Sequence, residues 1–140
     1  MRRNAALALV LVAAGCGGHS EAKHAATPNV AKSRPAPIKV TISAPTHHPK
    51  VNKPWPVAVR VTDASGKPLP ARLTMRILFG GNPVGKVDNG RLYRFVGTWH
   101  ERKGNEVTWP PASRGQPLEF EVIVTAQHMT VKRTWAIQAR

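Results

Sequence analysis

Residues 55–79, WPVAVRVTDASGKPLPARLTMRILF, decide the fold of this chain. Apolar residues alternate with small or polar residues over 57–62 and again over 72–79. This alternation is typical of a strand that buries one face and exposes the other. The two runs flank the polar segment 63–68, which contains a glycine, so the sequence predicts a β-hairpin here.

Similar short runs on both sides of the hairpin predict further strands. They cover residues 38–43, 84–87, 92–99, 107–109, 118–124 and 129–138. Turn-forming residues separate these runs, and no stretch of the domain has a helical period. About seven short strands without helices predict an all-β fold, an immunoglobulin-like antiparallel β-sandwich, over residues 38–140.

The predicted hairpin resembles a recurrent pattern in bacterial immunoglobulin-like domains. In that pattern a strand ends in Thr-Asp, a Gly-Lys-Pro turn follows, and the next strand opens on a small residue. The matching segments are 57–63, 66–68 and 71–77, about a fifth of the chain. The YtkA-like family shares this hairpin and is linked to copper handling. The resemblance implies an immunoglobulin-like fold far more than any function.

The first residues have the pattern of a secretory signal peptide. Arg2 and Arg3 precede the apolar run 5–14, and small residues follow it. An apolar run of this length is too short to span a bilayer as a helix, which needs about 20 residues. We therefore expect residues 1–15 to be a signal peptide.

Residues 13–16, Ala-Ala-Gly-Cys, resemble the lipobox of bacterial lipoproteins, with Ala13 in place of the usual Leu. The resemblance implies cleavage before Cys16, a diacylglyceryl group on its sulfur and an acyl chain on its new amine. Two or more chains give stable anchoring, where one is marginal. We therefore expect Cys16 to hold the protein at the extracytoplasmic face of the cell membrane. A free or buried thiol after an ordinary signal peptide is the alternative.

Residues 16–37 are expected to form a flexible tether behind the lipidated cysteine. Small, polar and proline residues dominate this segment, and it has no apolar period. A chain of this length has an r.m.s. reach of roughly 25 Å. Its basic residues can contact anionic headgroups, although a passive spacer explains the composition equally well.

The chain is strongly basic, with 21 Lys and Arg against 7 Asp and Glu. The basic residues are spread from Lys39 to Arg140. Such an excess favours polyanionic surroundings, such as acidic envelope polymers or anionic lipid headgroups. Alternatively, the charge only keeps the domain soluble. The single cysteine excludes an intramolecular disulfide, so a hydrophobic core must stabilise the domain.

Candidate metal ligands are His47, His48, His128 and Met129. Imidazole suits zinc and copper, and thioether sulfur suits copper. No known ligand spacing joins these residues, so we expect exposed histidines without a metal. The lipid on Cys16 is then the only prosthetic group that the sequence predicts.

Catalysis has little support in the sequence. Glu119 and Glu121 lie on the same face of a predicted strand, about 7 Å apart. They resemble a carboxylate pair for acid–base work, but a solvated strand face, ion-paired with a neighbouring strand, is favoured. No nucleophile elbow, phosphate loop or triad spacing occurs, and we therefore predict that the protein is not an enzyme.

The segment 109–117, WPPASRGQP, combines a tryptophan, prolines and an arginine. Trp109 and Arg114 are candidate partner-binding residues, since Trp and Arg are favoured at hot spots. Alternatively, Trp109 closes the end of the sandwich core. Four tryptophans near basic residues also suit stacking on sugars or bases, but the export signal disfavours nucleic acid as a partner.

Together these features predict a membrane-anchored, extracytoplasmic and non-enzymatic binding or scaffolding module of the bacterial envelope. Its partner would be an envelope protein or an acidic envelope polymer. The alternative is an extracytoplasmic copper- or zinc-handling protein of YtkA-like type.

Overall fold

The computed structural model describes residues 37–140, and the predicted signal peptide, the lipidation site Cys16 and the tether lie outside the described residues. Two short 3₁₀ turns, η1 (Val87–Gly90) and η2 (Pro111–Ser113), interrupt an otherwise all-strand chain. The strands are β1 (Lys39–Ser43), β2 (Pro54–Trp55), β3 (Ala58–Thr62), β4 (Pro70–Phe79), β5 (Asn82–Lys86), β6 (Tyr93–Val96), β7 (Thr98–His100), β8 (Val107–Thr108), β9 (Pro117–Ala126) and β10 (Met129–Gln138). No helix of residues 37–140 has the length and apolar character that crossing a membrane requires.

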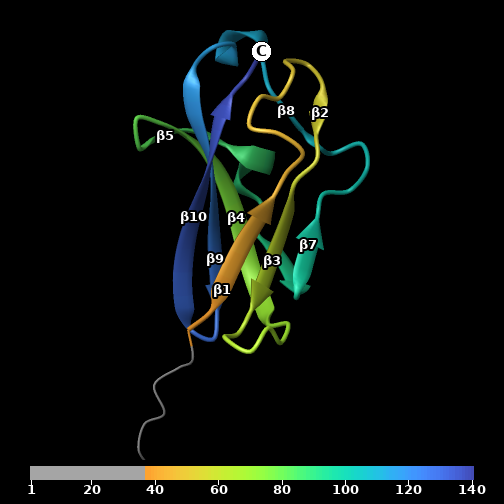
Figure 1. Ribbon diagram of the computed structural model, residues 1–140, viewed down its shortest axis with the longest axis vertical. Coiled ribbons are helices and arrows are strands. Elements are labelled where there is room, and N and C mark those ends of the chain that lie inside the picture. Colours follow the sequence, from red (N-terminus) through yellow and green to blue (C-terminus); the bar gives the residue numbers. More distant parts are fainter. Residues whose placement is uncertain (1–36) are drawn as a thin grey trace, which may run out of the picture. The chain divides into compact units, whose positions relative to one another are not determined.

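Two main antiparallel sheets form the domain (Figure 1). One sheet is three-stranded, with the order β1-β3-β7. The other is five-stranded, with the order β10-β9-β4-β5, and β6 also pairs with β4. The short pair β2-β8 is separate. The predicted all-β antiparallel sandwich is therefore confirmed, while its immunoglobulin-like type stays a prediction.

A single hydrophobic core lies between the two sheets. Val59 and Val61 enter it from β3, Leu73 from β4, and Phe120 and Val122 from β9, all of them fully buried. Burying an aliphatic or aromatic side chain of this size contributes about 1.5–3 kcal/mol relative to leaving it exposed. The alternation seen in the sequence thus marks the faces that build this core.

The predicted hairpin over 55–79 is wrong in its pairing, because β3 and β4 belong to different sheets. Only the residues next to the turn bond as in a hairpin: Asp63 N donates to Lys67 O (3.0 Å), and Leu69 N donates to Val61 O (3.2 Å). The chain then crosses the core to the other sheet. Alternation of apolar and polar residues cannot distinguish a hairpin within one sheet from a crossing between two sheets, since either arrangement buries one face of each strand.

The predicted strand over 92–99 is also divided between the sheets. Gly97 separates β6, which pairs with β4, from β7, which pairs with β3. Its φ of +74° is a left-handed conformation that glycine adopts without the usual side-chain penalty. The division explains why both faces of this run carry bulky residues, since β6 and β7 face the core from opposite sides.

The strands define two ends of the sandwich. The proximal end is where residue 37 meets β1, and it holds the starts of β1, β4 and β10 with the ends of β3, β6 and β9. The distal end holds the loops 44–53 and 101–116 and the C-terminus (top of Figure 1).

Candidate functional site

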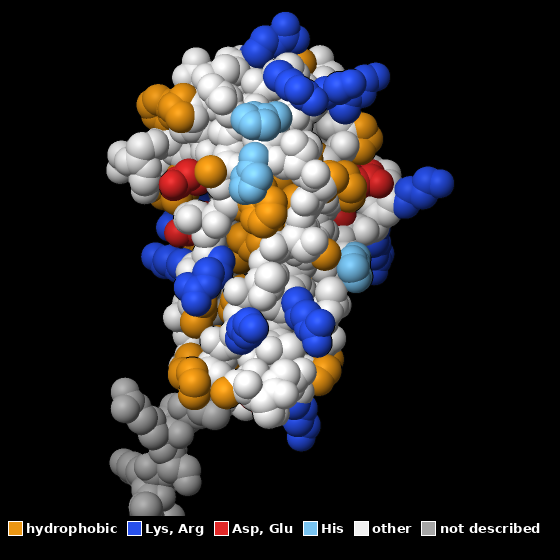
Figure 2. Space-filling view, viewed as in Figure 1, with side chains coloured by type: hydrophobic (Ala, Val, Ile, Leu, Met, Phe, Trp, Pro, Cys, Tyr) orange, Lys and Arg blue, Asp and Glu red, His pale blue; other side chains and the backbone are white. Residues whose placement is uncertain are grey.

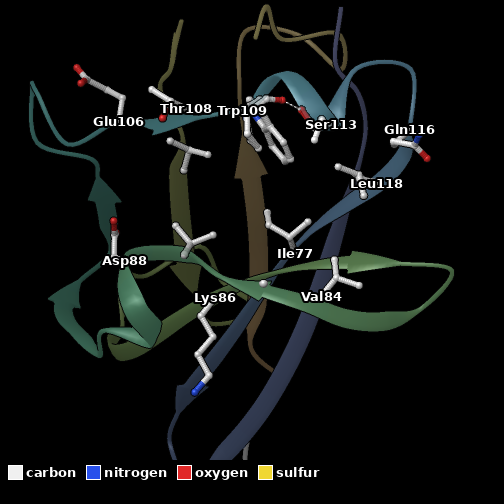
Figure 3. Close-up of a pocket in the computed structure, with 15 residues that line it drawn as sticks. Ile77, Val84, Lys86, Asp88, Glu106, Thr108, Trp109, Ser113, Gln116 and Leu118 are labelled. Carbon is white, nitrogen blue, oxygen red and sulfur yellow. Dashed lines mark hydrogen bonds between the residues drawn. The ribbon is translucent and has the colours of Figure 1, made fainter. Parts of the chain in front are cut away.

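The distal end contains a cavity of about 500 Å³ between β5 and η1 on one side and β8 and η2 on the other (Figure 3). This distal cavity is lined by Ile77, Val84, Gly85, Lys86, Val87, Asp88, Glu106, Val107, Thr108, Trp109, Pro110, Ala112, Ser113, Gln116 and Leu118. A volume of this size lies within the range of small-molecule and peptide side-chain sites.

The floor of the distal cavity is apolar and comes from the large sheet. Ile77 on β4 and Leu118 on β9 are half-buried there, at the edge of the core. On β5, Gly85 pairs with Ile77 and Pro83 pairs with Leu78, which leaves Val84 as the extra residue of a bulge. Val84 is 60% exposed at the rim, so an apolar side chain is available to a ligand.

Trp109 forms part of the opposite wall. Its side chain is 2% exposed and packs edge-on against Trp55, with 5.6 Å between ring centroids. Its buried indole Nε1 has no hydrogen-bond partner within the described residues. An unpaired buried donor is costly, about 1–3 kcal/mol, and is uncommon in native proteins. The cavity wall therefore contains an unpaired indole N–H that lies beneath its surface.

The η2 segment gives this wall a fixed shape. Ser113 Oγ donates to Pro110 O at 2.6 Å (dashed in Figure 3), and Ser113 N donates to the same oxygen at 2.9 Å. The next turn is fastened to the end of the chain, because Gly115 N donates to Ala139 O at 2.8 Å. A wall ordered before binding reduces the entropy that a ligand must overcome.

The charged residues that line the distal cavity are Lys86, Asp88 and Glu106, two carboxylates against one amine in a basic protein. Glu101 lies behind them, beside Asp88. Glu101 Oε2 accepts from Val57 N (3.1 Å) and Oε1 accepts from Val107 N (3.2 Å). Burial raises the pKa of Glu101 to about 7, although both of these hydrogen bonds lower it. This carboxyl group therefore holds β8 in place and titrates near neutrality.

Tyr93 links Asp88 to β6. Its hydroxyl donates to Asp88 Oδ2 at 2.6 Å. Burial, together with this hydrogen bond, raises the pKa of Tyr93 to about 12. The phenol thus stays protonated at neutral pH and holds the Asp88 carboxylate at the cavity.

Glu101→Gln should flatten the pH dependence of stability. The folded-state pKa of about 7 lies above the ordinary 4.5, so this group stabilises the fold most below pH 4.5 and loses that contribution as pH rises through 7. Urea unfolding across this range should show the wild-type free energy of unfolding falling more steeply than that of the variant. Glu119→Gln is the control, and parallel curves for wild type and Glu101→Gln would contradict the assignment.

Trp109 and Arg114, the predicted partner-binding residues, lie at the same end of the domain. Arg114 follows η2 directly and is exposed, and its backbone forms an isolated parallel β-bridge with Ala139. Trp109 is buried, so a partner can meet it only through the distal cavity. Trp109 therefore has the core position expected of the alternative, and its role in binding stays a prediction.

His47 and His48 lie beside the end of β10, also at the distal end, where Gln138 N donates to His47 O at 2.9 Å. The His47 ring stacks on Trp135 with 4.2 Å between centroids. His47 Nδ1 lies 2.7 Å from Ala136 O, and His48 Nδ1 lies 3.3 Å from Gln138 O. A carbonyl only accepts, so each Nδ1 is the donor and each Nε2 is left available. Figure 2 shows neighbouring histidine side chains beside hydrophobic surface on this face.

His128 and Met129 lie at the other end of the domain, at the β9–β10 turn. The length of β10, at about 3.3 Å per residue, separates them from His47 and His48. The four predicted metal ligands therefore do not form one site. No three His, Cys, Asp or Glu residues of 37–140 are arranged to hold a metal ion. Metal handling stays a prediction that rests on His47 and His48 alone.

Glu119 and Glu121 do not share a solvated face as predicted. Glu121 is only 5% exposed, and its carboxylate accepts from Arg76 Nε on the neighbouring β4. The predicted ion pair with a neighbouring strand is confirmed, and the predicted exposure of Glu121 is wrong. The Arg76 side chain covers this carboxylate, which is one physical reason for its burial.

The predicted strand over 84–87 overlaps β5 and the first residue of η1, but sequence patterns did not identify β5 and η1 as the wall of a cavity. The five residues of β5 are all exposed and have no apolar period. The only available indication was Val84, an apolar residue between turn-forming residues. A comparison of the sequence with protein-family models gave no match, and a comparison with curated proteins gave none either.

Proposed function

We propose that this protein is a membrane-anchored, extracytoplasmic and non-enzymatic binding module, and that the distal cavity is its binding site. The observation that carries this proposal is the position of the cavity. Residue 37 joins β1 at the proximal end, and the cavity lies at the opposite end. A domain tethered from its proximal end would present the cavity away from the membrane surface.

The cavity suits an extended segment of an envelope protein. β5 is the last strand of its sheet, so its outer edge can hydrogen-bond to an added strand. Such a segment could place an apolar side chain against Val84 and Leu118. The carboxylates of Asp88 and Glu106 outnumber the one amine of Lys86 in this lining, so a protein partner fits the cavity better than an acidic polymer.

Site-specific photocrosslinking in intact cells tests this proposal. The crosslinking amino acid p-benzoylphenylalanine replaces Val84, at the rim of the cavity, or Ala64, in the turn after β3 at the proximal end, as the control. Both positions are exposed. We expect one discrete crosslinked protein from position 84, at least about tenfold above position 64. Equal products from both positions, or none from position 84, would refute the cavity as the binding site.

The membrane anchor has a separate test. Cys16→Ser removes the sulfur that the lipobox resemblance assigns to the diacylglyceryl group. We expect the variant to leave the membrane fraction and appear among soluble proteins, because a protein without acyl chains has no stable anchor. Full retention in the membrane would refute the anchor and leave the cavity proposal standing.

A further inference from the structure

Arg72 and Arg94 lie directly opposite each other on β4 and β6. Their neighbours Ala71 and Leu73 are buried in the core, so both arginines belong to the outer face of the large sheet. Directly opposed residues in an antiparallel pair have Cβ atoms about 4.5–5.5 Å apart, and like charges there are destabilising. An anion near two opposed arginines would offset this repulsion.

No acidic side chain of residues 37–140 supplies that anion. The one ion pair within this part of the chain joins Arg76 to Glu121. On the other side of Arg72, β9 contributes Thr125, whose hydroxyl lies 3.0 Å from that of Thr130. Arg94 also lines a second hollow together with Asp88 and Glu101, but neither carboxylate lies within ion-pair distance of it. Both guanidinium groups can therefore bind an external ligand.

The two arginines line a surface hollow of about 600 Å³, here called the proximal hollow. It is also lined by Pro70, Val96, Thr125 and His128. Guanidinium groups donate two parallel hydrogen bonds to phosphate or carboxylate oxygens, which gives such a site geometric preference as well as charge. The hollow therefore offers space for a ligand, two guanidinium groups that can each donate two parallel hydrogen bonds, and positive charge without an acidic partner.

The position of the hollow indicates which anion reaches it. It lies where β4 starts and β6 ends, at the end of the sandwich where residue 37 joins β1. Val96, 66% exposed, adds apolar surface beside the two arginines. Cations next to an exposed apolar residue match a surface that meets lipid headgroups.

We propose that the proximal hollow binds the phosphate group of an anionic phospholipid headgroup through Arg72 and Arg94. This inference rests on the proposed membrane anchor, which would keep the proximal end close to the bilayer. Headgroup binding would orient the domain and thereby direct the distal cavity outward. The tether alone fixes only a distance, so the hollow would add a preferred orientation.

The isolated domain is suitable for the test. Its hydrophobic core is complete between Ile38 and Ala139, and residues 34–140 form one compact unit. The domain lacks Cys16, so vesicle binding reports the hollow and not the anchor. The assay is sedimentation with phosphatidylcholine vesicles, with or without phosphatidylglycerol. Binding that requires phosphatidylglycerol supports the proposal, and equal binding to both kinds of vesicle would overturn it.

Two double variants remove the same amount of positive charge, one at the proximal end of the domain and the other at the distal end. Arg72→Gln/Arg94→Gln should weaken binding to phosphatidylglycerol vesicles by about thirtyfold, since each cation at an anionic surface contributes roughly fivefold. Arg102→Gln/Arg114→Gln, at exposed distal positions, should change it by less than about threefold. Equal losses in both double variants would mean that net charge alone binds, and would overturn the site.

Two further measurements check that the double variant is folded and that the ligand is a lipid. The Arg72→Gln/Arg94→Gln domain should melt no lower than wild type, because the change relieves a repulsion. A lower melting temperature would contradict the unpaired state of the two arginines. Inorganic phosphate should reduce vesicle binding no more than sodium chloride does at equal ionic strength, because a vesicle offers many headgroups to the hollow at once. Displacement by phosphate far below the ionic strength at which chloride displaces the vesicles would overturn the lipid as the ligand in favour of a soluble phosphate.

Discussion

Gly97→Ala should destabilise the domain by at least about 2–4 kcal/mol, because it combines backbone strain with overpacking. A Cβ at this position would lie 2.9 Å from Pro68 Cβ, and the φ of +74° disfavours any side chain. This cost is a large part of the roughly 5–15 kcal/mol that stabilises a typical domain. Chemical unfolding monitored by circular dichroism would measure it.

The size of this effect follows from what Gly97 connects. Its carbonyl accepts from Val61 N (2.7 Å) in one sheet, and its N–H donates to Leu69 O (3.0 Å), where the chain enters the other. Gly104→Ala is the matched control, since its φ is +90° but a Cβ there would meet nothing within 4 Å. If both variants lost the same stability, backbone strain alone would explain the result and the contact with Pro68 would be irrelevant.

Arg76→Ala is the second change with a large expected effect. It leaves the Glu121 carboxylate, whose side chain is 7% exposed, without its partner on β4. Removing one member of a buried ion pair costs about 3–5 kcal/mol, because the remaining charge stays desolvated. Urea unfolding at neutral pH would show this loss as a lower midpoint.

Two controls separate the buried charge from simple truncation. Arg133→Ala shortens an exposed arginine on β10 whose side chain bonds only to Lys132 O, and it should cost less than about 1 kcal/mol. Arg76→Met/Glu121→Leu removes both charges and should recover most of the lost stability. An Arg76→Ala midpoint equal to that of Arg133→Ala would show that water reaches Glu121 and stabilises it without a partner.

Strand positions were largely predictable, because each strand buries one face. The runs 118–124 and 129–138 became β9 and β10, which pair along their whole length. The sheet to which a strand belongs was not predictable from alternation. The crossing after β3 depends on the hydrogen bond between Leu69 and Gly97, two residues far apart in the sequence.

The candidate sites were only partly predictable for the same reason. The segment 109–117 was unusual in the sequence, and it does form one wall of the distal cavity. The facing wall, with Val84 and Asp88, meets it only through the fold. Arg72 and Arg94 likewise become neighbours only through the register of β4 and β6. The local sequence pattern predicts whether a residue is buried or exposed. A binding site, however, depends on which residues from distant parts of the sequence the fold brings next to it.

The crossing between sheets also has a consequence for the order of folding. One edge of β4 pairs with β5 and β6, and the opposite edge pairs with β9. The second edge therefore has no partner until residues 117–126 have been synthesised. Pairing at this sequence separation must pay loop-closure entropy before any contact forms, which slows folding. A chain emerging from the ribosome would therefore leave one edge of β4 unpaired until residues 117–126 have been made. The large sheet is the later of the two to be completed, because β1, β3 and β7 all precede β9 in the sequence.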